Sequence, residues 1–213
     1  MKISEIYRSI QGESTYAGLP CTFIRAAGCS LRCRYCDTGY ALDPRSGESM
    51  TLDAILEQVK PLGYDLVEIT GGEPLEQKET PELCRRLLEL GAKVLLETGG
   101  AYRIDSLPEG VVTILDIKTP SSGMAHRNEW TNLERLSPCD EVKIVIGDRE
   151  DFDWAVAVCR RYGLFGKGPL HFSPAFPALS PALLAQWILE EKIPVRLHLQ
   201  WHKYIWPPDR RGV

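Results

Sequence analysis

Residues 28–38 of this chain read GCSLRCRYCDT and form what we call the cysteine loop. The loop brings the thiols of Cys29, Cys33 and Cys36 close together, whereas the other cysteines are scattered along the chain. A four-iron cluster normally takes four thiolates, so three close ligands leave one iron open for a small chelating molecule. A structural zinc site, which needs four protein ligands, and a redox dithiol made of one Cys-x2-Cys pair are the alternatives. The three-thiol spacing favours the iron–sulfur cluster.

A β-rich run precedes the cysteine loop, and similar runs recur along the chain. Strands are expected at residues 22–26, 66–70, 93–97, 111–117, 141–146, 170–173 and 195–199. Helical patterns lie between several of them: one with Thr80 as its N-cap and Gly91 after its end, one at 148–162, and one that begins at Ser180 and Pro181. This alternation predicts parallel strands joined by right-handed crossovers.

The length limits the architecture that these elements can form. With 213 residues, a complete eight-unit barrel of typically ~250 residues is tight. We therefore expect an α/β fold, a partial (βα)6 TIM-like barrel in one domain over residues 1–213, with a doubly wound open sheet as the alternative. In either fold, chemistry belongs at the carboxyl ends of the strands. That rule brings the cysteine loop and residues 71–74, 98–100 and 118–120 to one rim.

Composition and charge exclude several classes of protein. Hydrophobic residues make up 44% of the chain and charged residues 25%, which is typical of a globular protein with a sizeable core. The net charge of −4 predicts no broad basic face for nucleic acid. Apolar runs are far shorter than the roughly 20 residues of a membrane helix, and the N-terminus lacks a secretory signal. Seven cysteines, an odd number, argue against a disulfide framework, so we expect a soluble cytoplasmic protein without nucleic-acid or membrane partners.

The cysteine spacing resembles that of the radical S-adenosylmethionine (SAM) superfamily, whose members carry Cys-x3-Cys-x2-Cys with an aromatic residue before the last cysteine. Tyr35 fills the aromatic position, and Gly71-Gly72-Glu73-Pro74 is similar to the superfamily's Gly-Gly-Glu motif, where a carboxylate or carbonyl can accept from the ammonium group of SAM. The resemblance implies a [4Fe-4S] cluster on Cys29, Cys33 and Cys36. It also implies that SAM binds the open iron and that one electron cleaves it to methionine and a 5′-deoxyadenosyl radical.

A closer resemblance, to the 7-carboxy-7-deazaguanine synthase family of queuosine biosynthesis, rests on three pieces of sequence. Ile10-Gln11-Gly12-Glu13 precedes the first expected strand, Arg25 lies within that strand, and Cys36-Asp37-Thr38 closes the cysteine loop. The resemblance implies a carbon–nitrogen lyase that converts 6-carboxy-5,6,7,8-tetrahydropterin to 7-carboxy-7-deazaguanine with loss of ammonia. It also implies SAM as a regenerated cofactor, assistance by Mg²⁺, a flavodoxin- or ferredoxin-type reductant, and a homodimer.

The same resemblance implies roles for individual residues, with the adenosyl radical rather than a side chain as the catalyst. The substrate-binding residues are expected to be Ile10, Gln11, Gly12, Glu13, Arg25, Thr70 and His202. SAM is expected to contact Tyr35, Cys36, Asp37, Gly72 and Lys118. The Thr38 hydroxyl is the expected protein ligand of Mg²⁺. The C-terminal segment, about residues 198–213, is expected to cap the substrate.

Each of these residues also has a simpler structural interpretation. Arg25 offers a bidentate fork for the substrate carboxylate, or it forms an ordinary ion pair in its strand. Gln11 and Glu13 suit the donor and acceptor edge of a pterin, or they belong to a turn. Thr38 suits a hard, oxygen-seeking Mg²⁺, or it caps a helix. His202 is a polar contact in the substrate pocket, or it is a structural histidine.

Two positions depart from the family pattern. Ser14 stands where many relatives have glycine, which is expected to alter the backbone of that turn. Asp116-Ile117-Lys118 replaces a common Ser-Pro-Lys; Lys118 is kept, and Ser121 or Ser122 could substitute for the lost serine in contacting SAM.

Two other functions are compatible with the cysteine loop. A glycyl-radical-enzyme activase would use the same cleavage on a partner protein, although residues 11–13 and Arg25 argue against it. A non-catalytic iron–sulfur electron carrier would need a fourth cluster ligand. Near the C-terminus, the aromatic run at 204–206 is expected to be a core plug or a dimer contact.

Overall fold

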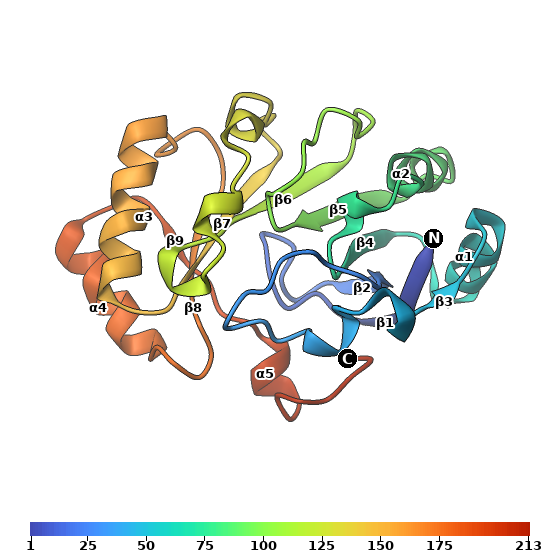
Figure 1. The fold of residues 1–213 in the computed structure, drawn as a ribbon, viewed down its shortest axis with the longest axis horizontal. Helices are drawn as coiled ribbons and strands as arrows, with labels where there is room; N and C mark the ends of the chain where they lie inside the picture. The colour runs from blue at the N-terminus through green and yellow to red at the C-terminus, as the bar shows by residue number, and fades with distance from the viewer.

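The computed structural model describes residues 1–213, and at its centre is one curved, open sheet of nine strands (Figure 1). In chain order the strands are β1 (Lys2–Ile10), β2 (Pro20–Ala26), β3 (Glu48–Ser49), β4 (Leu66–Gly71), β5 (Lys93–Thr98), β6 (Val112–Ile117), β7 (Glu141–Ile146), β8 (Leu170–Pro174) and β9 (Arg196–Leu197). Across the sheet they follow the order β3-β1-β2-β4-β5-β6-β7-β8-β9. The edge strands β3 and β9 do not pair with each other, so the sheet is the expected partial barrel rather than a closed one.

The parallel part of the sheet determines where the functional loops lie. Strands β2 and β4 to β9 run parallel to one another, whereas β1 is antiparallel to both β2 and β3. The register places Arg25 opposite Thr70, and Asp116 opposite Lys143. Paired residues on neighbouring strands share a face of the sheet, and all four of these side chains line the same cavity. The sheet therefore has polar groups on its inner face.

Four helices pack on the outer side of the sheet, and a fifth lies in the C-terminal segment beside the cavity. The first four are α1 (Leu52–Val59), α2 (Thr80–Glu89), α3 (Arg149–Tyr162) and α4 (Pro181–Glu191), and the fifth is the short α5 (His202–Ile205). Helix α1 begins after Thr51, whose side chain accepts a hydrogen bond from the Ala54 N–H. Helix α3 ends at Gly163, which adopts the left-handed conformation that stops a helix. Figure 1 shows α1 and α2 at one end of the sheet and α3 and α4 at the other.

Loops rather than α-helices connect β5 to β6 and β6 to β7. Glycine and proline at positions 99, 100, 108 and 110 interrupt the first connection. The second contains the short 3-10 helices Pro120–Ser122, Ala125–Arg127 and Trp130–Glu134. The remaining 3-10 helices are Gly39–Ala41, Pro44–Ser46, Lys60–Leu62 and Pro74–Glu76. The middle of the barrel is therefore covered by loops on its outer side (Figure 1).

Two large apolar cores join the sheet to its helices. One packs α3 and α4 against β6, β7 and β8 around the fully buried Phe152 and Phe172. The other packs α1 and α2 against β2, β4 and β5 around Ile55. Burial of each such side chain contributes roughly 1.5–3 kcal/mol. Cys84 and Cys159 belong to these cores and pack as small hydrophobes.

Two of the expected elements differ in the structure. The strand expected at 195–199 covers only Arg196–Leu197, because it is an edge strand that pairs with β8 alone. Thr80 is the first residue of α2 and not its N-cap, a position that Glu79 occupies. The Thr80 hydroxyl instead donates to the Pro74 carbonyl (2.6 Å).

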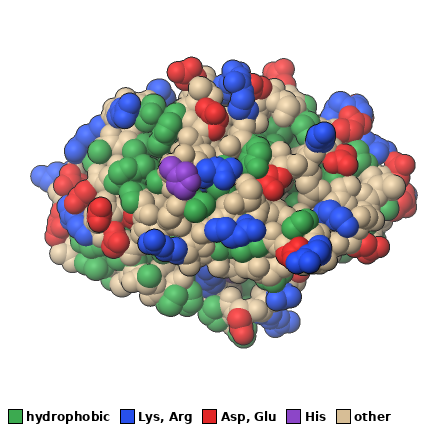
Figure 2. Space-filling model, in the orientation of Figure 1, with side chains coloured by type: hydrophobic (Ala, Val, Ile, Leu, Met, Phe, Trp, Pro, Cys, Tyr) green, Lys and Arg blue, Asp and Glu red, His purple; other side chains and the backbone are tan.

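The surface carries charges of both signs and several exposed apolar side chains. Figure 2 shows acidic and basic groups interspersed over one face of the molecule. Tyr204 and Ile205 on α5 are 61% and 51% exposed, so the alternative that this run plugs the core is wrong. None of the helices combines the length and the apolar character needed to cross a membrane.

We expect Asp148→Ala to lower the free energy of unfolding by about 1 kcal/mol, because the Asp148 side chain caps α3 by accepting the Asp151 N–H (2.9 Å). Ser180→Ala is the matched control, since Ser180 is the N-cap of α4 but makes no capping bond with its side chain. Urea denaturation followed by circular dichroism measures both. Equal losses in the two variants would contradict the capping role of Asp148.

Candidate active site

A cavity of about 460 Å³ lies at the carboxyl ends of the parallel strands, between the cysteine loop and the C-terminal segment. Apart from Ser121 and Ser122, the residues expected to hold the cluster, SAM, substrate and Mg²⁺ line it. These are Ile10, Gln11, Gly12, Glu13, Arg25, Cys29, Cys33, Tyr35, Cys36, Asp37, Thr38, Thr70, Gly72, Lys118 and His202. The fold therefore brings them together in one place, and their separate roles stay predictions.

The three loop thiols are free and line this cavity. Burial raises the pKa of each of them, that of Cys29 to about 12. A four-iron cluster takes each thiolate on a different iron, so it needs thiols that face one cavity rather than one point. No three Cys, His, Asp or Glu side chains converge on a single point as a lone metal ion would require. None of the other cysteines, Cys21, Cys84, Cys139 and Cys159, lines the cavity, so the donor set fits a cluster with three protein thiolates.

Glycine at position 72 allows the loop after β4 to press against the cysteine loop. The Gly72 N–H donates to the Ala26 carbonyl (2.9 Å), and the Glu73 N–H donates to the Gly28 carbonyl (2.8 Å). A Cβ on Gly72 would lie 2.0 Å from the Gly28 oxygen, a distance that no side chain tolerates. The Gly-Gly-Glu segment therefore fixes the cysteine loop by backbone contact.

The Glu73 carboxylate is buried and has three protein donors. It accepts from the Thr98 hydroxyl (2.8 Å), the Gly99 N–H (2.8 Å) and the Leu75 N–H (3.0 Å). These bonds tie the loop after β4 to the loop after β5. The side chain thus supports the fold, and the acceptors that this segment offers a ligand are backbone carbonyls.

The turn after β1 presents Glu13 to the cavity and uses Gln11 as its support. The Gln11 amide donates to the Glu68 carboxyl group, and its oxygen accepts the Glu13 N–H (3.0 Å). Gln11 is only 2% exposed, so its amide is committed to protein partners. The Glu13 carboxylate accepts from Lys143 Nζ (2.6 Å) and from Gln200 Nε2 (2.8 Å).

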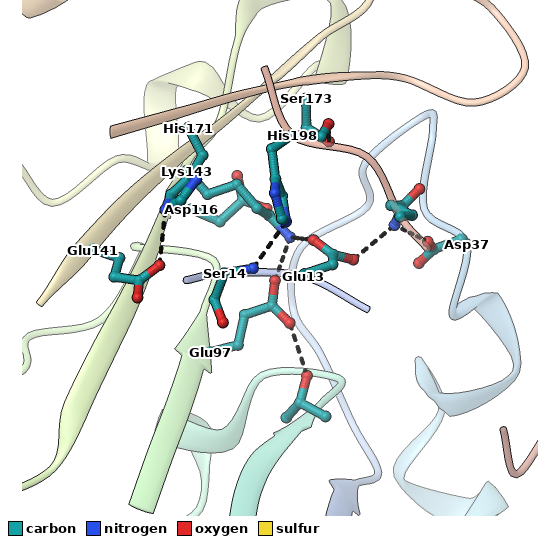
Figure 3. Close-up of polar contacts among 12 residues, drawn as sticks. Glu13, Ser14, Asp37, Glu97, Asp116, Glu141, Lys143, His171, Ser173 and His198 are labelled. Atoms are coloured by element: carbon teal, nitrogen blue, oxygen red, sulfur yellow. Dashed lines mark hydrogen bonds and ion pairs between the residues drawn. The ribbon is translucent and has the colours of Figure 1, made fainter. Parts of the chain in front are cut away.

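Ser14 adopts the backbone conformation that glycine favours, with a φ of 64°. Its N–H donates to His198 Nε2 (2.8 Å), and its hydroxyl accepts the Tyr16 N–H (3.2 Å). Burial lowers the pKa of His198 to about 4, so the ring is a neutral acceptor. Beside it, Glu141 accepts from the Thr15 N–H (3.0 Å). Glu141 also pairs with His171 (Figure 3). The turn therefore keeps a glycine-like conformation despite the serine.

Arg25 reaches the cavity from β2 while it also makes an ion pair. Its Nε donates to Glu5 Oε1 (2.8 Å), and its Nη2 donates to the Tyr7 hydroxyl (2.7 Å). The Tyr40 hydroxyl donates to the same Glu5 oxygen (2.6 Å). Nη1 of Arg25 has no hydrogen-bond partner in the protein. The ion pair and the expected carboxylate contact are therefore compatible.

Lys143, in the middle of β7, is a cavity residue that the sequence analysis missed. Its ammonium group lies among three carboxylates (Figure 3): it donates to Glu13 and to Glu97 and lies 3.9 Å from Asp116 Oδ2. Glu97 in turn accepts from the Thr70 hydroxyl (3.1 Å). The only sequence feature that points to Lys143 is its position as a single lysine among the apolar residues of the strand EVKIVI.

Asp116, at the first of the two positions that depart from the common Ser-Pro-Lys, lies on the cavity wall. Its Oδ2 accepts from Lys118 Nζ (2.8 Å), whereas its buried Oδ1 has no partner. Ser121 and Ser122 do not line the cavity, so the expectation that one of them substitutes for the serine is wrong. The Ser121 hydroxyl bonds to Asp151, and that of Ser122 donates to the Thr119 carbonyl.

Tyr35 and Thr38 flank the last cysteine of the loop. The Tyr35 hydroxyl lies 3.2 Å from Thr119 Oγ1, and burial raises the pKa of Tyr35 to about 12. Thr38 precedes the 3-10 helix Gly39–Ala41 but makes no capping bond with its side chain. Its hydroxyl donates to Asp37 Oδ1 (3.0 Å), which leaves the oxygen lone pairs available on the cavity wall.

The C-terminal segment closes one side of the cavity. Asp37 accepts from Lys203 Nζ (2.9 Å) and Gln200 Nε2 (2.8 Å), and these contacts hold its pKa well below the usual range despite burial. His202 packs against Gly12, where a Cβ would lie 2.7 Å from His202 Nδ1. Burial lowers the pKa of His202. Residues 208–213 also line the cavity.

Comparison with known proteins agrees with this geometry. The family model described as the radical SAM superfamily matches residues 23–122. A 7-carboxy-7-deazaguanine synthase from Chlorobaculum tepidum is 46% identical over 220 residues, which cover 100% of this chain and 97% of that protein. One from Koribacter versatilis is 43% identical, with 100% of both chains covered.

Solved structures support the fold. The crystal structure of QueE from Escherichia coli matches with a TM-score of 0.75 and 22% identity, covering 93% of each chain. Streptococcus suis SuiB bound to its precursor peptide SuiA matches with a TM-score of 0.57 and 14% identity, covering 83% of this chain and 47% of that one. From its full-length relatives and its matching fold, this chain belongs to the 7-carboxy-7-deazaguanine synthase family of the radical SAM superfamily.

Proposed function

We propose that the chain converts 6-carboxy-5,6,7,8-tetrahydropterin to 7-carboxy-7-deazaguanine with loss of ammonia, as a carbon–nitrogen lyase of 7-deazapurine and queuosine biosynthesis. One observation carries the proposal: a single cavity joins three free thiols to an arginine and a group of carboxylates. Relatives that cover the whole chain are named for this product. The activase and electron-carrier alternatives are not favoured, because no such name occurs among these relatives.

Membership of the radical SAM superfamily implies a [4Fe-4S] cluster and SAM. Cys29, Cys33 and Cys36 would hold the cluster, and SAM would lie against Tyr35, Cys36, Asp37, Gly72 and Lys118. When bound, the two cofactors supply a one-electron cleavage that generates a carbon-centred radical. The residues of this chain contribute orientation and the exclusion of water. The backbone contact between Gly72 and the cysteine loop keeps the two cofactor sites in a fixed relation.

The substrate offers a carboxylate and a planar edge of donors and acceptors, and the cavity has a group for each. Arg25 would bind the carboxylate through its free Nη1 edge, and Glu13 would accept from the ring N–H groups. Thr70 and His202 would contact the ring from β4 and α5. Ile10 and Gly12 would contribute backbone groups, and Gln11 would keep the turn in place through its bonds to Glu68 and Glu13. The C-terminal segment, residues 198–213, would cap the bound substrate.

A Mg²⁺ ion, a homodimer and a protein reductant complete the proposal. Thr38 would contribute the one protein oxygen to a Mg²⁺ ion that keeps several waters and binds the substrate carboxylate. The exposed Trp201, Tyr204 and Ile205 would lie in the dimer contact. A flavodoxin or ferredoxin would supply the electron. The cytoplasm is the proposed location, since its reducing conditions would keep all the free thiols reduced.

Replacing Cys33 with alanine should abolish iron binding and turnover, because a cluster ligand is lost. The effect should exceed the roughly 10–100-fold loss that removing a hydrogen bond to a metal ligand causes. Iron analysis and dithionite-driven conversion of the carboxypterin after anaerobic reconstitution measure it. Cys139→Ala is the matched control, since this exposed thiol lies outside the cavity. A Cys33→Ala protein with a full cluster would refute the assignment.

Arg25→Lys should raise KM for the carboxypterin about 10–100-fold, because a lysine keeps the charge near Glu5 but loses the fork, at a cost of about 1.5–3 kcal/mol. The turnover number should change much less. Steady-state kinetics on reconstituted enzyme checks the prediction, with the exposed Arg45→Lys as control. An unchanged KM in Arg25→Lys would leave this arginine with only its structural ion pair.

Thr38→Ala should remove most of the activation by Mg²⁺, whereas Thr38→Ser, which keeps a hydroxyl at the same place, should retain it. Rates measured across a Mg²⁺ titration of both variants test this directly. If Thr38→Ala shows the same half-saturating Mg²⁺ concentration as the unmodified protein, the metal site lies elsewhere.

A further inference from the structure

We infer that Lys143 is a positioning residue for substrate recognition, which holds the Glu13 and Glu97 carboxylates in place as acceptors for the N–H groups of an aminopyrimidinone ring. The inference rests on the proposed function, because that function supplies the ligand. It adds a residue that the family motifs in the sequence do not contain. Lys143 acts here through the two carboxylates and not by touching the substrate.

The geometry around Lys143 joins elements that are distant in the sequence. Glu13 comes from the turn after β1, Glu97 from β5 and Asp116 from β6. Lys143 bonds to the first two and lies 3.9 Å from the third, which is its partner in the β6–β7 register. The side chain of Lys143 is only 7% exposed. Figure 3 shows its ammonium group as the common centre of these carboxylates.

Glu13 illustrates what the ammonium group does. Burial on its own raises the pKa of the Glu13 carboxyl, yet Lys143, with smaller contributions from His198 and His202, brings that pKa to about 2. Glu68 lies in the same cavity without an ammonium partner. Burial and the neighbouring Glu97 and Glu13 hold the pKa of Glu68 well above its usual range. The pocket therefore contains one buried carboxyl group with a lowered pKa and one with a raised pKa. The contact with Lys143 is what lowers the pKa of Glu13.

The protonation state of Glu13 matters for the ligand. An aminopyrimidinone ring presents an exocyclic amino group and a ring N–H, which are both donors. An ionised carboxylate is an acceptor only, whereas a protonated carboxyl group brings a hydrogen that competes with those donors. Charge-assisted bonds to such an acceptor are also the stronger ones. Loss of Lys143 should therefore weaken binding most where Glu13 takes up a proton.

The surroundings of Glu13 determine how ligand affinity should change with pH when Lys143 is removed. Several groups surround Glu13. Strands β7, β5 and β4 contribute Lys143, Glu97 and Glu68, respectively. The C-terminal segment contributes Gln200, His198 and His202, and Asp37 and Lys203 lie beyond Gln200. With Lys143 present, Glu13 stays ionised throughout the neutral range. Without it, burial and the remaining carboxylates raise the pKa of Glu13. Ligand affinity should then fall as the pH falls.

Calorimetric titration with 7-carboxy-7-deazaguanine, which carries the same ring edge, tests the inference without turnover. The unmodified protein and Lys143→Arg should bind with nearly constant affinity between about pH 6 and pH 8.5. Lys143→Met should bind about tenfold or more weakly at the lower pH and recover part of that loss at the higher one. In a Glu13→Gln background there is no carboxylate at position 13 for Lys143 to position. The Lys143→Met change should therefore reduce ligand affinity much less in that background.

Each outcome separates this inference from the proposed function. If the unmodified protein does not bind the product at all, the proposed function fails. If it binds but Lys143→Met matches it in affinity and pH profile, the role of Lys143 is overturned. An equal, pH-independent loss in Lys143→Met and Lys143→Arg would show a purely structural role and overturn it too. Should Lys143→Met not fold, Lys143→Gln takes its place, and a Glu13→Gln protein with unmodified affinity would itself overturn the inference.

Discussion

The active site depends on a contact between two pieces of backbone. The loop after β4 and the cysteine loop after β2 meet where Gly72 lies against Gly28, and the hydrogen bond from the Glu73 N–H to the Gly28 carbonyl closes the contact. Only glycine at position 72 leaves room for it. Because β2 and β4 are parallel neighbours, this contact lies at the carboxyl end of both strands. It gives the thiols a fixed position relative to the rest of the cavity.

Toward the carboxyl ends of the strands the interior of the barrel is polar, whereas a small apolar cluster around Phe23 and Leu95 packs deeper on the same face. Charged groups there are paired across strands: Lys118 with Asp116, and Lys143 with Glu13 and Glu97. Removing one partner of such a buried pair leaves an uncompensated charge, which costs about 3–5 kcal/mol. The open sheet thus uses ionic contacts to shape a pocket that a ligand can enter, while the two larger apolar cores lie between the sheet and its outer helices.

The sequence predicts much of this arrangement because its signals are local. The cysteine spacing, the Gly-Gly-Glu segment and the β-rich runs are all read within a few residues, and each falls at the expected place in the fold. Strand β1 and helix α1 were not expected, since β1 mixes polar and apolar residues on both faces and α1 has only eight residues. Short edge elements such as β9 depend on a neighbour rather than on their own residues.

The site itself could be predicted only in part, for a related reason. Lys143 and Glu97 gain their importance from partners on other strands, and a single charge in an apolar strand does not identify those partners. Gln11 looked like a ligand-reading side chain, but burial commits its amide to Glu68 and to Glu13. Likewise, the residues that face the pocket after β6 depend on the path of the following loop. Asp116 lines the pocket, whereas Ser121 and Ser122 do not.

The path of the C-terminal segment has a practical consequence for anyone handling this protein. Lys203 is bonded to Asp37, the Arg211 guanidinium stacks on the Tyr40 ring at 4.0 Å, and Val213 lies on the cavity wall. An affinity tag fused after that residue would emerge at the mouth of the pocket and compete with whatever enters it. Such a tag should therefore be cleaved before any ligand is added.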